Sequence, residues 1–386
     1  MKKLIYIFLI LIITSVGFSQ GDASVKIEEA NQLFSQQDYG QALIFYHDIL
    51  REDSTQNILL EKAGLSAYRL GDFKLAKQFF HQLESNVDSS EIAFKNLASL
   101  YEAEENSPKA IKYYTRLVKA DPENPLFNRK LGQQYQKSGL LLEAYPYFIK
   151  AYALNSKDNY TVRALVNIFI DNKQFPTADS ILEKALAYDS LNINNTLLLA
   201  RSKYSQKQYD TTTFVLRTLR GRLDLDNYFN KMLGYSYLQI DSFDLAIHHL
   251  HMSLVNEGNP EYAHYYLGIA YEKLEDIESA VHHYQEAAKA GISKDVDLYH
   301  KNLARIYNEK NDLRKAIPHY QDAYKYSKDP LILFFHARAA DIYYKDKNIA
   351  INYYKKYEDS DHKNVEYKQY AKERRRYLRE QVHLSK

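Results

Sequence analysis

Apolar residues recur along this chain at a fixed step of 34 positions. Leucine keeps this step at Leu97, Leu131, Leu165, Leu199, Leu233 and Leu267. Alanine keeps it at Ala42, Ala76, Ala110, Ala144, Ala178, Ala246 and Ala280. With Glu91 as position 1 of a repeat, the leucines occupy position 7 and the alanines position 20. Self-similarity at this period indicates a stack of identical supersecondary units.

Each unit has the pattern of two amphipathic helices, because its apolar residues are spaced by three and four. Position 8 is mostly small, which lets the two helices approach closely, as at Ala30, Gly64, Ala98, Gly132, Ala200, Gly234 and Gly268. Positions 17 and 24 are bulky, as at Phe73 and Phe80. Turn residues such as Gly71 and Gly139 separate the halves, so we predict helix–turn–helix units and no sheet.

These residues resemble the tetratricopeptide repeat family, which carries Leu-Gly/Ala-x-x-Tyr in its first helix and Ala-x-x-x-Phe/Tyr in its second. The resemblance implies an all-α, right-handed α-solenoid of about ten helix hairpins with a C-terminal capping helix, serving as a binding scaffold. The chain departs from the family in having no tryptophan. The unit from Ile193 to Asp226 is the most degenerate, with Lys203 at position 11 and Thr212 at position 20, and we expect it to be the least stable internal unit.

The repeats are expected to fill residues 23–363. They begin near Ala23, Asn57, Glu91, Pro125, Asn159, Ile193, Asn227, Glu261, Asp297 and Leu333, with a two-residue insertion around Ser293. Residues 364–386 form a helical, basic segment that fits the polar cap a solenoid needs at its open end. Its run Lys372 to Arg376 allows at most peripheral membrane contact.

The first 19 residues have the pattern of a secretory signal peptide. Lys2 and Lys3 precede a short apolar run, and Gly17 and Ser19 supply small residues before a cleavage site. We therefore expect an exported protein, in the periplasm or secreted; the alternative is an uncleaved anchor. The chain contains no cysteine, so lipoprotein acylation and disulfides are excluded.

Charge and motif content argue against several functions. Lys2 and Lys3 account for the net charge of +2, so the remaining chain is formally neutral and nucleic acid is not an expected partner. The sequence has no phosphate-binding glycine loop, nucleophile elbow or His-Glu-x-x-His motif. We therefore expect neither an enzyme nor a cofactor.

The resemblance implies that positions 2, 5, 9, 12 and 13 line a concave face. Cations and amides recur there, at Lys95, Arg129, Gln133, Arg163, Asn167, Arg201 and Lys231. Tyrosine, of which the chain has 36, is found there at Tyr160, Tyr228, Tyr262 and Tyr265. Cations can pair with carboxylates while amides bond a peptide backbone. This pattern predicts a concave groove that binds a partner protein, or an extended acidic or carboxylate-ended segment of one. The partner is expected to be an envelope protein.

Two alternatives remain open: capture of a glycan by the concave tyrosines, and a structural adaptor that acts through its convex face. Histidines cluster on the second helices, at His248, His249, His251, His282, His283 and His319. Imidazoles in such a ladder could hold a divalent metal. Because positions 22 and 23 are expected to face outward and no carboxylate stands at a fixed spacing, we interpret the cluster as a solvated face and expect no metal.

Overall fold

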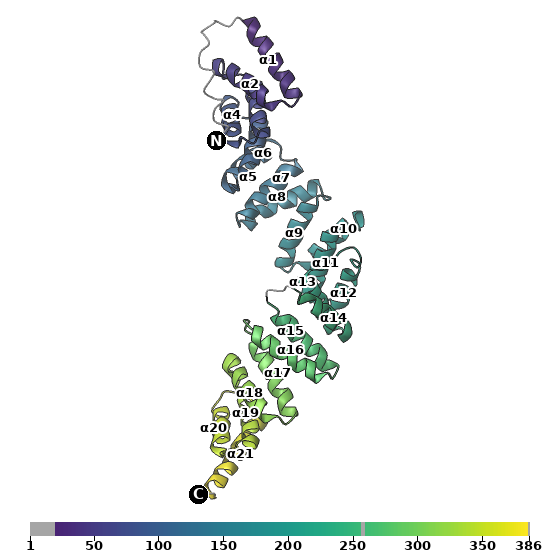
Figure 1. Cartoon of the computed structure of the whole chain (residues 1–386), viewed down its shortest axis with the longest axis vertical. Helices are drawn as coiled ribbons and strands as arrows, with labels where there is room; N and C mark the ends of the chain where they lie inside the picture. Colours follow the sequence, from purple (N-terminus) through teal and green to yellow (C-terminus); the bar gives the residue numbers. More distant parts are fainter. Residues whose placement is uncertain (1–19, 256–258, 385–386) are drawn as a thin grey trace, which may run out of the picture. The chain divides into compact units, whose positions relative to one another are not determined.

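The computed structural model describes residues 20–255 and 259–384, and every regular element in these ranges is a helix (Figure 1). This confirms the predicted all-α class. None of the described helices has the length and apolar character that crossing a bilayer needs. The predicted signal peptide lies outside the described residues.

The contacts divide the chain into two compact units, the first ending at Asn172 and the second beginning at Lys173. The first unit contains α1 (Gln20–Ser35), α2 (Tyr39–Glu52), α3 (Asn57–Arg69), α4 (Phe73–Asn86), α5 (Glu91–Ala103), α6 (Ser107–Ala120), α7 (Pro125–Lys137), α8 (Leu141–Leu154) and α9 (Asn159–Asp171). The second unit contains α10 (Phe175–Tyr188), α11 (Ile193–Ser205), α12 (Tyr209–Arg217), α13 (Asn227–Gln239), α14 (Phe243–Ser253), α15 (Glu261–Lys273), α16 (Ile277–Ala290), α17 (Val296–Glu309), α18 (Leu313–Ser327), α19 (Pro330–Tyr343), α20 (Lys347–Glu358) and α21 (Val365–Leu384). Within each unit, consecutive helices pack as antiparallel pairs, as expected for a helical-repeat solenoid.

The turn between the two helices of a pair has the same backbone conformation in every described pair except α19–α20. Its position 15 is left-handed, at Gln37, Gly71, Glu105, Gly139, Lys173, Lys207, Asp241, Glu275 and Asn311. The next amide donates back to the carbonyl of position 11, for example from Asp72 to Ala67 at 2.9 Å. This is the Schellman closure of a helix end. The same residue, Asp72, then caps the second helix by accepting from the Leu75 amide at 2.9 Å.

The small residue at position 8 allows close contact with position 24 of the second helix. A Cβ added at Gly268 would lie 2.6 Å from the ring of Tyr284. A Cβ at Gly234 would lie 2.6 Å from Cγ of Leu250. Tyr284 and Leu250 are fully buried. Helix pairing in these units therefore depends on residues that leave room for the large side chain opposite.

A second contact joins positions 11 and 23 by parallel ring stacking. In the first unit both rings are phenols: Tyr101 stacks on Tyr113 with centroids 5.8 Å apart, and Tyr135 stacks on Tyr147 at 5.7 Å. In three pairs of the second unit, position 23 is an imidazole instead. The stacked pairs there are Tyr237 with His249, Tyr271 with His283, and Tyr307 with His319.

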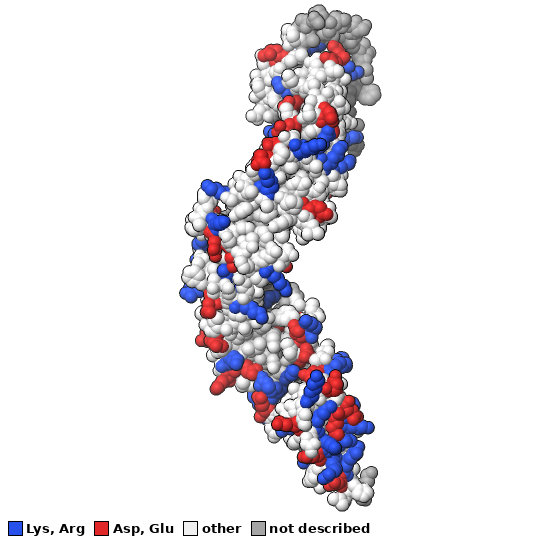
Figure 2. Space-filling view, turned by 180° about the vertical axis from the view of Figure 1, so that it is seen from behind, with Lys and Arg blue, Asp and Glu red and all other residues white. Residues whose placement is uncertain are grey.

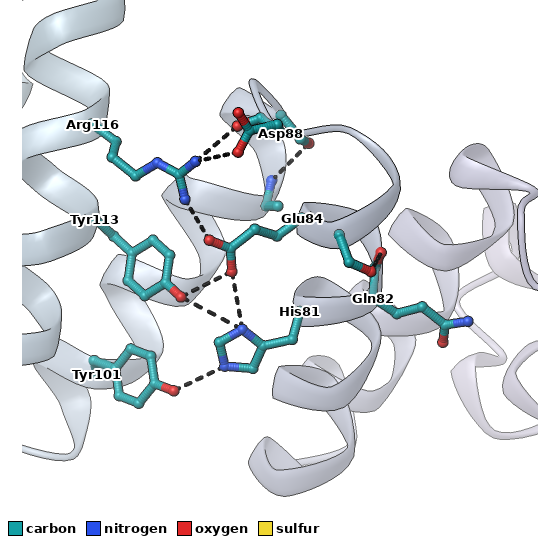
Figure 3. Close-up of polar contacts among 10 residues, drawn as sticks. His81, Gln82, Glu84, Asp88, Tyr101, Tyr113 and Arg116 are labelled. Atoms are coloured by element: carbon teal, nitrogen blue, oxygen red, sulfur yellow. Dashed lines mark hydrogen bonds and ion pairs between the residues drawn. The ribbon is translucent and has the colours of Figure 1, made fainter.

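In the first unit, Glu84 and His81 on α4 together join this helix to α5 and α6 (Figure 3). The Glu84 carboxylate accepts from the Tyr113 hydroxyl at 2.9 Å and from the Arg116 guanidinium, both on α6. His81 on α4 contacts the hydroxyl of Tyr101 on α5 at 2.9 Å. Burial raises the pKa of Glu84, but the bonds from His81 and Tyr113 outweigh it and hold that pKa below its usual value. The charged network thus links neighbouring pairs.

In the second unit, a buried carboxylate holds the loop that contains the two-residue insertion. Glu261, the first residue of α15, is fully buried. It accepts from the backbone amides of Ile292 at 3.1 Å and Ser293 at 3.2 Å, from the Ser293 hydroxyl at 2.5 Å, and from Tyr299 at 2.8 Å. The insertion is therefore accommodated between α16 and α17 by a specific acceptor.

At the C-terminal end, α21 covers the last helix pair. Phe334 stacks on Tyr367 with centroids 4.5 Å apart. Arg374 bonds Asp341 at 2.7 Å, and Arg375 pairs with Glu358 at 2.7 Å. Two cations of the basic run are therefore paired with acids of the preceding helices, which fits a capping helix.

A polar network joins α11, the first helix of the degenerate pair, to the preceding helix α10. Asp179, which is only 7% exposed, accepts from Ser202 at 2.6 Å, Lys203 at 2.7 Å and Gln206 at 2.9 Å. Burial raises the pKa of Asp179, but these bonds outweigh it and lower that pKa overall. Lys203 at position 11 is thus a partner for a buried carboxylate.

We expect residues 193–226 to open before the neighbouring pairs. The helix α12 has only 9 residues, fewer than any other described second helix of a pair, so it buries less apolar surface against its neighbours. Amide hydrogen exchange measured by mass spectrometry should show earlier exchange here than in residues 125–158 or 261–290. Equal protection of the three segments would contradict this expectation.

Candidate functional site

In the first unit, two of the three predicted cations have acidic partners within the chain. Lys95 pairs with Glu91 at 2.5 Å, and its ammonium lies 5.4 Å from the ring centre of Phe127. Arg129 pairs with Asp158 at 3.6 Å. Arg163 is exposed on α9. At Arg129, the chain's own Asp158 therefore occupies the role that was expected for a ligand carboxylate.

Arg129 also lines a shallow pocket of about 190 Å³ in the first unit. Leu126, Ala151 and Thr161 contribute to its wall. The guanidinium lies 5.7 Å from the ring centre of Tyr160, so the structure brings these two predicted residues together. Gln133 on α7 and Asn167 on α9 are half-buried on the same series of first helices.

In the second unit, three predicted residues from successive pairs line one pocket of about 160 Å³. They are Tyr228 and Lys231 on α13 and Tyr262 on α15. Tyr204 of α11, Met232 and Tyr266 complete the lining. Arg201 is half-buried on α11 and is not among the lining residues.

A larger pocket of about 350 Å³ shares Tyr266 with the smaller one. Its lining includes Tyr235, Phe243 and Tyr265. The rings of Tyr235 and Tyr266 have centroids 4.5 Å apart, and those of Tyr204 and Tyr235 are 5.9 Å apart. We call Tyr204, Tyr228, Tyr235, Tyr262, Tyr265 and Tyr266 the tyrosine cluster.

Rings of the tyrosine cluster are positioned by burial and by one acceptor. Burial raises the pKa of Tyr204 and Tyr266, so both phenols are neutral and act as hydrogen-bond donors at pH 7. The Tyr262 hydroxyl donates to Asp295 at 2.9 Å. Tyr228 is 50% exposed and offers its ring to solvent. The cluster thus presents apolar ring surface edged by hydroxyl groups.

Outside the tyrosine cluster, positive and negative side chains are intermixed on the surface. On the face drawn in Figure 2, lysines and arginines are interspersed with aspartates and glutamates in both units. This agrees with the formal neutrality of the chain after residue 19. A broad electrostatic surface is therefore a weaker candidate for recognition than the aromatic pockets.

Three lining residues of the smaller pocket were not predicted from the sequence. Tyr204 occupies position 12, which belongs to the predicted concave set, so the register could have identified it. Met232 and Tyr266 occupy position 6, next to the buried leucine, where a large apolar residue is indistinguishable from core. Spatial proximity across pairs was needed to find them.

The interpretation of the histidines as a solvated face is wrong for position 23. His283 is only 6% exposed, and His249 and His319 are half-buried, because each stacks on the position-11 tyrosine of its own pair. Position 22 does face outward, as at His248 and His282. The statement that no carboxylate keeps a fixed spacing is also wrong, since Glu286 and Asp322 each follow a position-23 histidine by three residues.

Paired antiparallel helices with this ladder of contacts define a helical-repeat protein. The family model of the tetratricopeptide repeat matches residues 61–125, 95–159, 231–295 and 265–330, together more than half of the chain. The chain belongs to the tetratricopeptide repeat family. This family is generally a non-catalytic scaffold fold that mediates protein–protein interactions.

Several solved structures are similar to this chain. A tetratricopeptide repeat protein from Parabacteroides merdae is 15% identical, with 64% of this chain and 98% of that one covered and a TM-score of 0.42. PilF of Pseudomonas aeruginosa is 16% identical, covering 58% and 98%, with a TM-score of 0.43.

The C-terminal part of a repeat protein from Cytophaga hutchinsonii is 16% identical, covering 71% and 98%, with a TM-score of 0.43. Comparison with curated proteins gave no match. Identities and scores this low carry no functional inference for this chain.

Proposed function

We propose that this chain is a non-enzymatic scaffold of the bacterial cell envelope that binds an extended segment of a partner protein. The observation that carries the proposal is the convergence of Tyr228, Lys231 and Tyr262, from successive pairs, in one tyrosine-lined pocket. Export rests on the sequence pattern of residues 1–19 alone.

The size of the pocket favours a side chain as its occupant. A volume of about 160 Å³ lies below the ~300–1,000 Å³ of typical small-molecule sites. Tyrosine supplies rigid contact area with a polar tip and is enriched among residues that dominate interface energetics. An aromatic or aliphatic residue of the partner fits the pocket, and Lys231 at its wall favours a neighbouring carboxylate.

The cations of the first unit take a secondary role in this proposal. An exposed pair contributes under about 1 kcal/mol, and Lys95 and Arg129 already have carboxylate partners in the chain. Arg163 is exposed on α9 and can meet an acidic residue of the partner protein.

We expect Tyr228→Ala to weaken binding of the partner segment about 30-fold, because removal of a central aromatic anchor costs about 2 kcal/mol. A photo-crosslinking amino acid at position 228, introduced in the native host, identifies the partner. Peptides from that partner are then titrated against the variants. The matched control is Tyr377→Ala on α21, also about half exposed at 48%, which should leave affinity unchanged.

The same titration separates the alternatives. Arg163→Glu should reduce affinity only a few-fold and make it less sensitive to salt, because screening acts on exposed charges. Arg129→Glu is a poorer test, since it would place a carboxylate against Asp158. Crosslinking to glycan rather than protein at position 228 would favour the glycan alternative. Full affinity in Tyr228→Ala would overturn the proposal and favour the convex-face adaptor.

A further inference from the structure

Two successive helix pairs of the second unit contain the same histidine pair, in which the two Nδ1 atoms are in contact. His264 on α15 lies with its Nδ1 2.9 Å from Nδ1 of His283 on α16. His300 on α17 lies with its Nδ1 3.0 Å from Nδ1 of His319 on α18. In the preceding pair the first histidine is replaced by Asn230, whose side-chain oxygen lies 3.0 Å from Nδ1 of His249.

Aromatic stacking fixes the orientation of both imidazoles in the pair His300–His319. His319 lies parallel to the ring of Tyr307, with an interplanar angle of 5°. His300 lies parallel to the ring of Tyr326, with an angle of 4°. Stacking on these tyrosines holds the two Nδ1 atoms toward each other, which is the pre-organisation that a metal site requires.

A carboxylate completes the set at one pair only. Asp322 stands one helical turn after His319, and its oxygen and the two imidazole nitrogens all lie within 4.8 Å of one another. Among the described residues, this is the only such group of three histidine, aspartate or glutamate side chains. At the equivalent place in the preceding pair, Glu286 is instead bound by Lys289 at 2.6 Å.

We propose that His300, His319 and Asp322 form a binding site for one Zn²⁺-type divalent transition-metal ion. With metal–nitrogen bonds of about 2.0–2.1 Å, two imidazole nitrogens on one tetrahedral ion lie about 3.3 Å apart. The observed separation of 3.0 Å is close to that value, so the histidines need little movement. The half-buried Asp322 approaches by side-chain rotation.

The protonation state of the pair suits metal binding. Burial lowers the pKa of His319 to about 4 and also lowers that of His300. Both rings are therefore neutral at pH 7, as a metal ligand must be. Two imidazoles and one carboxylate favour Zn²⁺, Ni²⁺ or Cu²⁺ over Mg²⁺ and Ca²⁺, which prefer all-oxygen sites. Three protein ligands leave a fourth position for water or for a ligand atom of a partner.

The test is titration of the full, chelator-treated chain with ZnCl2 by calorimetry, with MgCl2 as the comparison ion. We expect one Zn²⁺ per chain with a dissociation constant in the micromolar range or below, and no uptake of Mg²⁺. Asp322→Asn should weaken binding at least about tenfold, since loss of even an outer-shell partner costs about 10–100-fold.

The preceding pair supplies the matched control, because Glu286→Gln makes the equivalent change at the corresponding position. It should leave Zn²⁺ affinity unchanged. Since Asp322 is half-buried and Asn is nearly isosteric, the helical circular dichroism of Asp322→Asn should match the parent. Absence of Zn²⁺ binding would overturn the proposal and leave His300–His319 as a hydrogen-bonded pair. Equal affinity in Asp322→Asn, or equal losses in both variants, would also overturn it.

Discussion

Glu261→Ala should destabilise the second unit by about 1–3 kcal/mol, the cost of leaving a buried donor, here the Tyr299 hydroxyl, without an acceptor. The substitution leaves the Tyr299 hydroxyl and the amides of Ile292 and Ser293 without the carboxylate they now share. Urea denaturation measures the change in unfolding free energy. Hydrogen exchange of residues 291–299 reports whether the loss is local to the loop, because repeat arrays need not unfold in one step.

The exposed Glu278 on α16 provides the control for this substitution, and Glu278→Ala should stay within about 0.5 kcal/mol. The effect of Glu261 should also depend on pH. Burial raises the pKa of the Glu261 carboxyl, but its bonds from Ser293, Ile292 and Tyr299 outweigh this and lower it overall.

A carboxyl with a depressed pKa stabilises the fold above its unfolded-state pKa, and that stability is lost as pH falls through the folded-state value. The difference between the parent chain and Glu261→Gln should therefore shrink below about pH 4, the usual range of a glutamate. A difference that stays constant from pH 7 to pH 3 would show that the negative charge of Glu261 contributes nothing.

Gly268→Ala should destabilise the pair α15–α16 by about 1–3 kcal/mol, the usual cost of overpacking. The added Cβ would lie 2.6 Å from two ring atoms of Tyr284. That ring cannot easily move, because it is buried and its hydroxyl donates to Glu272 at 2.9 Å. The loss should appear even though alanine has a helix propensity better than glycine by about 1 kcal/mol.

Gly40→Ala on α2 makes the same chemical change without the contact, since the nearest atom to its added Cβ is 3.8 Å away. We expect it to be neutral or to raise stability by up to about 1 kcal/mol. Thermal and urea denaturation of the two variants should thus give shifts of opposite sign or clearly different size. Similar shifts would mean that the position-8 contact does not limit packing.

Much of the fold could be predicted from the sequence because its contacts repeat locally. The spacing of Leu97, Ala110 and their equivalents determines which face of each helix is apolar, and position 8 determines how closely two helices approach. The buried acceptors Asp179 and Glu261 could not be predicted in this way. A charged residue acquires such a role from donors brought near by folding, and the sequence separates Glu261 from Ser293 by 32 positions.

The candidate site was predictable in part for the same reason. Tyr228, Lys231 and Tyr262 were found from the register, and the structure places them in one pocket. The pairing of Arg129 with Asp158 was missed, because Asp158 lies in the turn before the next pair. His300 was missed because its partner, His319, lies on the other helix of the pair.

The left-handed turn inside nine of the helix pairs has a consequence for engineering. Seven of these nine turns place a residue other than glycine at position 15, although left-handed backbone disfavours any side chain. Asp241 and Asn311 tolerate this conformation best, whereas Gln37, Glu105, Lys173, Lys207 and Glu275 lack that advantage. Glycine at those five places would relieve a small cost at each turn, and distant sites add almost independently. Thermostability could therefore be raised at these five turns, whose position-15 residues do not line any of the three pockets described above.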